Sequence, residues 1–275
     1  MDKFDEICRK IKKVEIQGAE NVAKAAVRAL MLRNDARSIK KLISLRPTEP
    51  CMRNAIGFVK PDPKKLGPVA LKHFTDSDKK IGEYGAKKID DGMTVFTHCH
   101  SSNVMDVLRR AKLDGKRYEV YCTETRPLLQ GRKTAKELKR LGIPVTMFVD
   151  SGARIALKDS DLFLFGADAI TSECKVVNKI GTEMMAEIAN KYDTGCYCCT
   201  DSWKYDATTV FGNKEPIEIR DPKEVWPGAP AGVKIMNLAF ERVDPDLITA
   251  IISELGVFPP EVFIQEVRKA YPWLG

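Results

Sequence analysis

Apolar residues recur at helical spacing through the first 90 residues of the chain. One stripe joins Phe4, Ile7, Cys8 and Ile11, and a second lies between Val22 and Leu32. This period is typical of amphipathic helices. Further helices are predicted to Leu45 after a cap at Asn34 or Asp35, from Cys51 to Lys60 and from Lys64 to Lys88, with breaks at RPTEP (46–50) and KPDP (60–63). The pattern predicts an all-helical N-terminal domain over residues 1–90.

From residue 91 onward, short apolar runs alternate with helical patterns. The runs are MTVFTHC, YEVYCTE, PVTMFVD, DLFLFGAD, KVVNKIG and TGCYCCT, and the helices are predicted over 103–113, 132–141, 152–158 and 182–191. Strands this uniformly apolar are typical of a parallel sheet with helices on both faces. We therefore predict an α/β fold: a Rossmann-like doubly wound parallel sheet over residues 91–275, with the smaller helical domain before it.

Composition narrows the class of protein. The chain has 275 residues, of which 44% are hydrophobic and 30% charged. No apolar run is long enough to span a membrane, and the charged N-terminus, MDKFDEICRKIKK, does not resemble a signal peptide. Eight cysteines in a chain of this length favour reduced thiols over a disulfide framework. We expect a cytoplasmic protein.

The formal net charge of +7 leaves several interpretations open. Lys and Arg are spread along the chain rather than gathered in one block, which favours a solvated surface and argues against a nucleic-acid partner. An electropositive cleft that concentrates a small phosphorylated substrate is equally compatible with the charge. Composition alone does not separate these alternatives.

Polar side chains follow the predicted strands. In doubly wound folds, ligands bind at the carboxyl ends of the strands, because these ends meet at one edge of the sheet. The residues at those ends are Cys99, Glu124, Asp150, Asp168 and Asp201. No glycine-rich dinucleotide fingerprint follows the first strand, where THCHSSN stands instead, so we expect neither NAD nor FAD nor any other cofactor.

The triplet His98-Cys99-His100 offers three interpretations: a metal site, a reactive thiol or a structural strand end. Neighbouring strand residues point to opposite faces, so at most the two histidines share a face, and we expect no metal. A thiol between a strand and a helix start lies near backbone N–H groups that bind anions and lower its pKa. From position alone, Cys99 is either inert or reactive. The third histidine, His73, is expected at the surface.

Three further residues carry a choice between function and structure. Asp168 follows an apolar strand and a Gly-Ala pair, so burial is expected to raise its pKa towards acid–base use, unless it is a helix N-cap. Asn178 and Lys179 precede a predicted helix, where a lysine either binds phosphate or is a surface cation.

Several motifs together resemble a known superfamily. They are LRPTEPCMRNAIGFV, THCHSSNV, ETRPLLQGRKTAKEL, VDSGAR, GADAIT, VVNKIGT, KYDATTVFG and the ending FPPEVFIQEVRKAYPWLG, and they nearly span the chain. The superfamily contains ribose 1,5-bisphosphate isomerases, methylthioribose 1-phosphate isomerases and the regulatory subunits of eukaryotic initiation factor 2B. The CHS triplet, the short length and the compact helical N-terminal part favour the archaeal ribose 1,5-bisphosphate isomerases.

The resemblance implies an aldose–ketose isomerase that converts ribose 1,5-bisphosphate to ribulose 1,5-bisphosphate in AMP and nucleoside salvage. It implies catalytic roles for Cys99 and Asp168, which would divide the proton transfers between them. The residues it implies for the two phosphates are Gln17, Gly18, Ala19, Glu20, Arg46, Ser101, Asn178, Lys179 and Lys204. It also implies homodimers that assemble to a hexamer, and it makes AMP a candidate activator.

The chain departs from the resembled pattern at two places. QGAE at 17–20 stands where the family has Arg-Gly-Ala-Gly, and Ser102 stands where the isomerases commonly carry Lys. Each lost charged contact would weaken phosphate binding by about 1.5–3 kcal/mol. Two alternatives therefore stay open: a methylthioribose 1-phosphate isomerase, and an initiation-factor-2B-like subunit that contacts a translation factor.

Overall fold

The computed structural model describes residues 2–46, 49–210 and 217–274. Pro47 and Thr48 of the predicted break, and Phe211 and Gly212 of the motif KYDATTVFG, lie outside the described residues.

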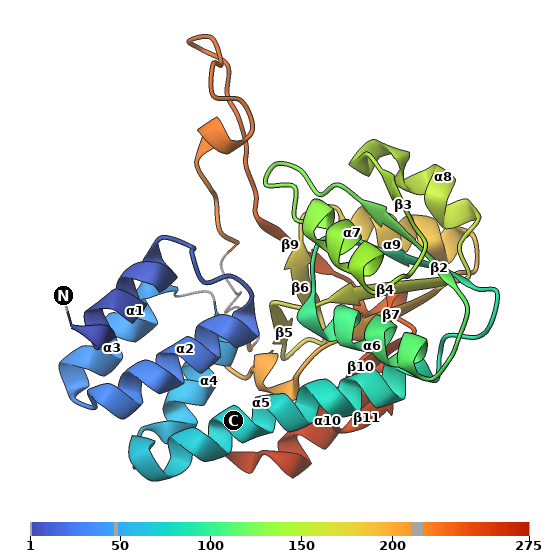
Figure 1. Cartoon of the computed structure of the whole chain (residues 1–275). Coiled ribbons are helices and arrows are strands. Elements are labelled where there is room, and N and C mark those ends of the chain that lie inside the picture. Colours follow the sequence, from blue (N-terminus) through green and yellow to red (C-terminus); the bar gives the residue numbers. More distant parts are fainter. Residues whose placement is uncertain (1, 47–48, 211–216, 275) are drawn as a thin grey trace.

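The N-terminal part of the chain is helical, as the apolar stripes predict. Its helices are α1 (Lys3–Lys12), α2 (Ala19–Leu32), α3 (Ala36–Leu45), α4 (Pro50–Val59) and α5 (Pro63–Ala86). Asp35 is the cap of α3, because its side chain accepts a hydrogen bond from Ser38 N at 2.9 Å. Helices α1 to α4 lie beside the α/β part, and the long α5 runs under the sheet (Figure 1). The domain boundary near residue 90 stays a prediction.

A seven-stranded sheet forms the centre of the remaining chain. Its order is β11-β10-β7-β4-β1-β2-β3, and only the β10–β11 pair is antiparallel. The strands are β1 (Thr94–Thr97), β2 (Glu119–Thr123), β3 (Val145–Phe148), β4 (Leu162–Gly166), β7 (Gly195–Cys199), β10 (Ala250–Ser253) and β11 (Gly256–Phe258). The helices are α6 (Ser102–Leu113), α7 (Gly131–Arg140), α8 (Ala153–Lys158), α9 (Thr182–Lys191) and α10 (Pro260–Ala270). The doubly wound class is confirmed.

Alternate strand residues bury against different helices. Val95 and Leu164 pack in one cluster with residues of α5, α6 and α7, whereas the neighbouring Phe96 and Phe163 pack in another with residues of α8 and α9. Because both faces of the sheet are covered, its strands carry apolar residues without a polar alternation. This burial is why the apolar runs were readable in the sequence.

A second, four-stranded sheet was not predicted. It has the order β8-β5-β6-β9, with β5 (Ala169–Thr171), β6 (Val176–Lys179), β8 (Tyr205–Asp206) and β9 (Phe240–Val243). We expected KVVNKIG, which contains β6, to join the parallel sheet. It pairs antiparallel with β5 instead. The reason is the connection of only four residues, 172–175, because a parallel crossover needs about a dozen residues or more.

The strand order places a crevice between β1 and β4. Strands β2 and β3 lie on one side of β1, and β4, β7 and β10 lie on the other. The chain therefore reverses its direction of travel across the sheet at the β1–β4 pair, which is where doubly wound folds bind ligands. Cys99 follows β1 and Asp168 follows β4, so both candidate catalytic residues stand at this position.

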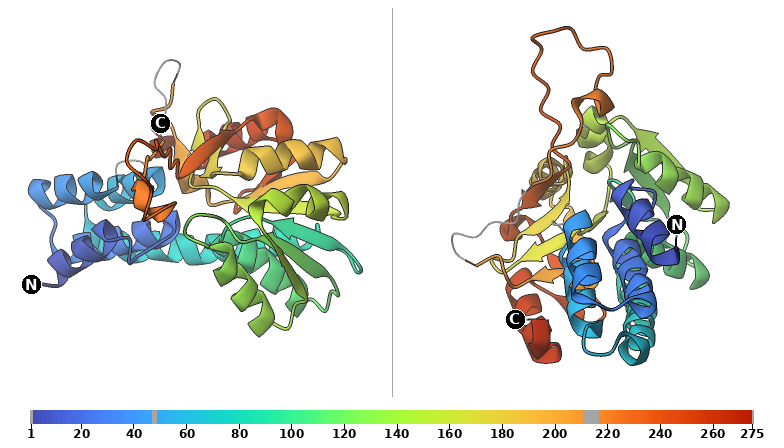
Figure 2. Two further views of the ribbon diagram at one scale, coloured as in Figure 1. Left: turned by 90° about the horizontal axis from the view of Figure 1, so that it is seen from above. Right: turned by 90° about the vertical axis from the view of Figure 1, so that its left-hand side faces the viewer.

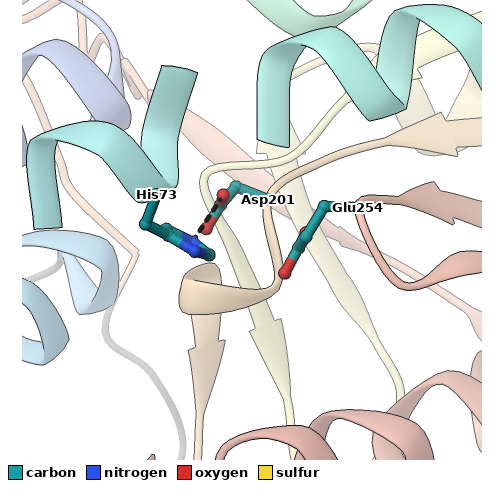
Figure 3. A group of neighbouring side chains, drawn as sticks. All are labelled: His73, Asp201 and Glu254. Carbon is teal, nitrogen blue, oxygen red and sulfur yellow. Dashed lines mark ion pairs between the residues drawn. The ribbon is translucent and has the colours of Figure 1, made fainter. Parts of the chain in front are cut away.

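His73 is not the surface residue that we expected. It lies on α5, stacks on Trp203 with ring centroids 4.0 Å apart, and its Nε2 lies 3.0 Å from Asp201 Oδ2 (Figure 3). Glu254, which follows β10, completes this buried cluster. Burial alone would lower the pKa of His73, but the carboxylates of Asp201 and Glu254 raise it overall. Asp201 therefore anchors α5 to the sheet rather than serving the crevice.

The cluster predicts a pH-dependent stability. Burial, and then the charge of Asp201, raise the pKa of Glu254 from 4.5 to about 7. The folded protein thus holds this proton more tightly than the unfolded chain, so the stabilisation is complete below pH 4.5 and is lost as pH rises through about 7. We expect Glu254 alone to contribute about 2 kcal/mol to the fall in the free energy of unfolding, measured in urea, between pH 5 and pH 8. Glu254→Gln should flatten this dependence, and an equally steep profile in the variant would contradict the assignment.

Two features complete the fold. The chain between η3 (Pro222–Glu224) and β9 extends away from the rest of the molecule (Figures 1 and 2). Its position is tied to the loop after β2, because Arg126 Nη2 donates to Val225 O at 3.1 Å.

Among the described residues, no helix combines the length and the apolarity needed to cross a bilayer.

Candidate active site

One cavity gathers all of the predicted site residues. It lies at the β1–β4 crevice, and its lining includes both candidate catalytic residues, Cys99 and Asp168. The same lining holds the whole predicted phosphate set: Gln17, Gly18, Ala19, Glu20, Arg46, Ser101, Asn178, Lys179 and Lys204. These residues come from the N-terminal helices, both sheets and the turn after β7. Their convergence is an observation, whereas their roles stay predictions.

Backbone contacts fix Cys99 in a tight turn. Its φ of +69° is in the left-handed region, which costs energy for a residue with a side chain. Its N–H donates to Thr125 Oγ1 at 3.0 Å, and its carbonyl accepts from Thr134 Oγ1 at 2.8 Å. Thr125 is held in turn by Asp150, whose carboxylate accepts from Thr125 N and Arg126 N. The turn places the half-buried Cys99 in the lining of the cavity.

The pKa of the Cys99 thiol is not lowered, contrary to the expectation from its position. Burial raises it to about 11, and the opposing effects of Lys179 and of the His100 backbone N–H are smaller. Desolvation of the thiolate therefore outweighs the nearby helix N-terminus. The thiol is neutral at neutral pH, so its chemistry at rest is to donate a proton.

The two flanking histidines hold the turn. His98 Nε2 lies 2.9 Å from Ile180 O, so this nitrogen carries the proton, and Nδ1 accepts from Thr123 Oγ1 at 2.5 Å. His100 Nδ1 lies 3.0 Å from Thr134 Oγ1, whose hydroxyl proton is already donated to Cys99. Burial lowers the pKa of both rings to about 4, so both are neutral. His98 ties the end of β1 to the turn after β6.

Asp168 stands between the two sheets. It lies two residues after the end of β4 at Gly166, and its N–H donates to Val177 O at 2.8 Å. Strand β5 begins at the next residue, so the alternative of a helix N-cap is wrong. Burial raises the pKa of the Asp168 carboxyl, and the positive charges of Lys179, Lys204 and Arg46 oppose the shift. The Asp168 carboxyl therefore lies in the cavity wall with its pKa raised and with positive charges around it.

Two helix N-termini point at the cavity. Gly18 is the N-cap of α2 with a φ of +88°, which only glycine adopts easily, and no side chain caps this end. Ser101 caps α6 and leaves further N–H groups of that helix at the cavity wall. Free N–H groups at a helix start bind anions. The N–H groups at the start of α9 are less available to an anion, because the Glu241 carboxylate already accepts from Glu183 N at 2.8 Å.

Buried cations line the wall near Asp168. Lys179 ends β6 with its Nζ 4.7 Å from the centre of the Phe240 ring, and Lys204 Nζ lies 3.2 Å from Asn103 Oδ1. Burial would lower the pKa of Lys204, but neighbouring acidic groups raise it overall, so the ammonium keeps its charge. Arg46 is paired with Glu49 at 2.7 Å. Burial and Asp168 raise the pKa of Glu49 to about 7.

Glu20 does not add a free negative charge to the cavity. Its carboxylate is buried and forms an ion pair with Lys24, one turn further along α2. Lys24 also lies 3.5 Å from Asp78. Burial and Glu20 raise the pKa of Asp78 to about 8, so this second carboxyl is mostly protonated at neutral pH. The negative charge that Glu20 adds relative to the family's glycine is therefore balanced by Lys24, whereas the positive charge of the family's arginine has no replacement at Gln17.

Sequence reasoning missed several lining residues and misplaced others. Glu49, Gln130, Lys133 and Arg220 also line the cavity. The first three lie within the motifs quoted above, which could have indicated them. Arg220 lies in an extended segment that contains none of these motifs. Of the predicted strand ends, Glu124, Asp150 and Asp201 are bound elsewhere: they contact Arg132, the Thr125 backbone and His73, respectively.

The packing at Ser101 gives a direct test of the site geometry. A Cβ at Gly166 would lie 2.5 Å from Ser101 Oγ and 2.7 Å from Ser101 Cβ, so Gly166→Ala must displace the α6 cap beside Cys99. We expect a loss of about 1–3 kcal/mol in the free energy of unfolding, measured in urea. Gly57→Ala is the matched control, because no atom lies within 4 Å of its new Cβ on helix α4. Equal stability of the two variants would contradict this packing.

Comparison with known proteins places the chain in a family. The model of the initiation factor 2 subunit family matches residues 9–260. Ribose 1,5-bisphosphate isomerase of Thermococcus kodakarensis is 36% identical over 304 residues, which cover 98% of this chain and 94% of that relative. The protein of the same name from Methanocaldococcus jannaschii is 37% identical over 299 residues, covering 100% of this chain and 97% of that relative.

A solved structure agrees with the sequence comparison. The crystal structure of a Pyrococcus horikoshii protein described as translation initiation factor eIF-2B superposes with a TM-score of 0.87 at 26% identity. The superposition covers 96% of this chain and 100% of that chain. The cavity at the β1–β4 crevice, the match over nearly the whole length and the shared fold lead to one conclusion: this chain belongs to the initiation factor 2 subunit family.

Proposed function

We propose that the chain is a sugar-phosphate aldose–ketose isomerase that converts ribose 1,5-bisphosphate to ribulose 1,5-bisphosphate. The observation that carries the proposal is the convergence of Cys99 and Asp168 on one cavity lined by Lys179, Lys204 and two helix N-termini. The relatives named as ribose 1,5-bisphosphate isomerases support the same substrate.

The reaction requires two proton transfers and one hydrogen transfer. The anomeric oxygen carries a phosphate, so the sugar opens only when the bond from C1 to the ring oxygen breaks and that oxygen gains a proton. The hydrogen on C2 moves with its electron pair, as a hydride, to the electron-deficient C1, and the C2 hydroxyl loses its proton to become the ketone. One group must therefore donate a proton and another must accept one.

The protonation states of the two side chains suit this division. Cys99 is neutral because its pKa is about 11, so it donates to the ring oxygen. The positive charges of Lys179 and Lys204 oppose the rise that burial causes in the pKa of Asp168, and in its ionised form this carboxylate accepts the proton from the C2 hydroxyl. Lys179, Lys204 and the N–H groups of α2 and α6 bind phosphate. No cofactor takes part in this scheme.

A parallel assay tests the proposal. The purified chain is incubated with ribose 1,5-bisphosphate and, separately, with methylthioribose 1-phosphate, and the ketose carbonyl is followed by ¹³C NMR. We expect a ketose from the bisphosphate only. Turnover of methylthioribose 1-phosphate alone would identify that sugar as the substrate in place of ribose 1,5-bisphosphate. Turnover of neither sugar would favour a binding protein related to the initiation factor subunits.

We also propose, from the family resemblance, that the chain forms homodimers that assemble to a hexamer and that AMP activates the enzyme. Analytical ultracentrifugation gives the mass of the assembly, and initial rates with and without AMP test activation. A monomer in solution, or rates unchanged by AMP, would contradict the respective part.

A further inference from the structure

A second cavity adjoins the one that holds Cys99 and Asp168. It runs along a stripe of α2 that faces Lys133 on the first turn of α7, and Gln17, Asn21 and Lys133 line both cavities. The remaining lining residues of the second cavity are Glu15, Ile16, Ala25 and Arg28. Because these three residues border both spaces, they stand between a ligand bound beside Cys99 and Asp168 and any group in the second cavity.

The second cavity carries a surplus of positive charge. Arg28 and Lys133 are both exposed, and within residues 2–46, 49–210 and 217–274 neither has an ion-pair partner. Glu15 is the carboxylate of the described lining, and Arg9 pairs with it at 2.5 Å. The unbalanced charge therefore belongs to two cations on opposite walls, α2 and α7.

The first cavity has less charge to offer than its lining suggests. Arg46 is paired with Glu49, and Arg220 is paired with Glu224 at 2.9 Å. Lys179 and Lys204 then supply at most two positive charges beside the Asp168 carboxyl. A pentose bisphosphate carries about three to four negative charges at neutral pH. These two cations match the charge of one phosphate at most, so the second phosphate needs another source of charge.

We propose that Lys133 and Arg28 bind the phosphate that is remote from the reacting carbon, which makes the chain selective for pentose bisphosphates over pentose 1-phosphates. This inference rests on the proposed function for the identity of the sugar. Lys133 is well placed for the task, because the next residue, Thr134, donates to Cys99 O at 2.8 Å. The Lys133 ammonium supplies, at the edge shared by the two cavities, the positive charge that Gln17 lacks.

Equilibrium binding tests the proposal. The dissociation constants of ribose 1,5-bisphosphate and ribose 1-phosphate are measured by calorimetry in a Cys99→Ser background, so that the sugar is not consumed. Lys133→Met should weaken binding of the bisphosphate by about 10- to 100-fold and leave binding of the 1-phosphate unchanged. Lys136→Met is the matched control, because Lys136 lies on the same helix and lines neither of the two cavities.

Rescue variants separate charge from structure. Lys133→Arg should keep the preference for the bisphosphate, and Gln17→Arg should restore it in the Lys133→Met background. Equal loss for both sugars, no loss for either, or the same loss in Lys136→Met would overturn the proposal. Binding of the bisphosphate without turnover, together with the loss in Lys133→Met, would refute the proposed function and support this subsite. A background variant without preference for the bisphosphate would overturn the subsite whatever the turnover.

Discussion

Replacing Cys99 with serine is expected to lower kcat for ribose 1,5-bisphosphate by about 1,000-fold, within the range found for loss of a general acid. The thiol is neutral because its pKa is about 11, and it remains a far stronger proton donor than the serine hydroxyl that replaces it. The substitution removes no charge from the cavity, so KM should change little. Steady-state kinetics at pH 7.5 give both values.

The control for this variant is Cys174→Ser. Cys174 is a half-buried thiol in the turn between β5 and β6, and it does not line the cavity. Full activity in Cys174→Ser together with the loss in Cys99→Ser would assign the effect to the site. A Cys99→Ser enzyme that keeps most of its kcat would exclude the thiol as the acid.

Asp168→Asn is expected to lower kcat by about 1,000-fold or more, because it removes the proton acceptor at the exit of β4. The substitution also takes a negative charge away from Lys179 and Lys204, so binding of the phosphates should become stronger rather than weaker. A low kcat with an unchanged or lower KM is therefore the expected signature.

The pH profile separates this role from a structural one. Asp168 must be ionised to accept a proton, so kcat of the wild type should fall as pH falls through its pKa, which burial raises above 3.8. The thiol stays protonated up to about pH 11, so no alkaline decline is expected below that value. Glu49, with a pKa of about 7, also faces the cavity, and Glu49→Gln shows whether it contributes to the acidic limb. An acidic limb that persists in the residual activity of Asp168→Asn would contradict the assignment.

Local pattern was sufficient to predict helices α1 to α9 and the parallel strands β1 to β4 and β7, whereas the C-terminal β10, β11 and α10 were not predicted. The stripe from Phe4 to Ile11 faces the core of the helical part, and strands such as β4 are buried on both faces, so periodicity reports their surroundings directly. Of the second sheet, β6 was predicted as a strand but assigned to the parallel sheet, and β5, β8 and β9, with two to four residues each, were not predicted. The antiparallel turn between β5 and β6 depends on loop length rather than on hydropathy.

The site was predictable in position and less so in chemistry. The ends of β1 and β4 indicated Cys99 and Asp168, because strand order concentrates ligand contacts at one edge of the sheet. Burial was not visible from the sequence, and it raises the thiol pKa that the neighbouring helix start was expected to lower. Similarly, the partner of Glu20 is Lys24, and the partner of His73 is a carboxylate 128 residues further along the chain. Such pairings depend on tertiary contacts.

The most direct measurement of the central claim is a comparison of four proteins in one assay. Wild type, Cys99→Ser, Asp168→Asn and the double variant are each mixed with ribose 1,5-bisphosphate, and formation of the C2 ketone is followed by ¹³C NMR. If the two side chains act on one bound sugar, the double variant should be no slower than the slower single variant, because either loss already stops the reaction. Independent losses that multiply in the double variant, or a ketone formed at the wild-type rate without both side chains, would contradict a shared site.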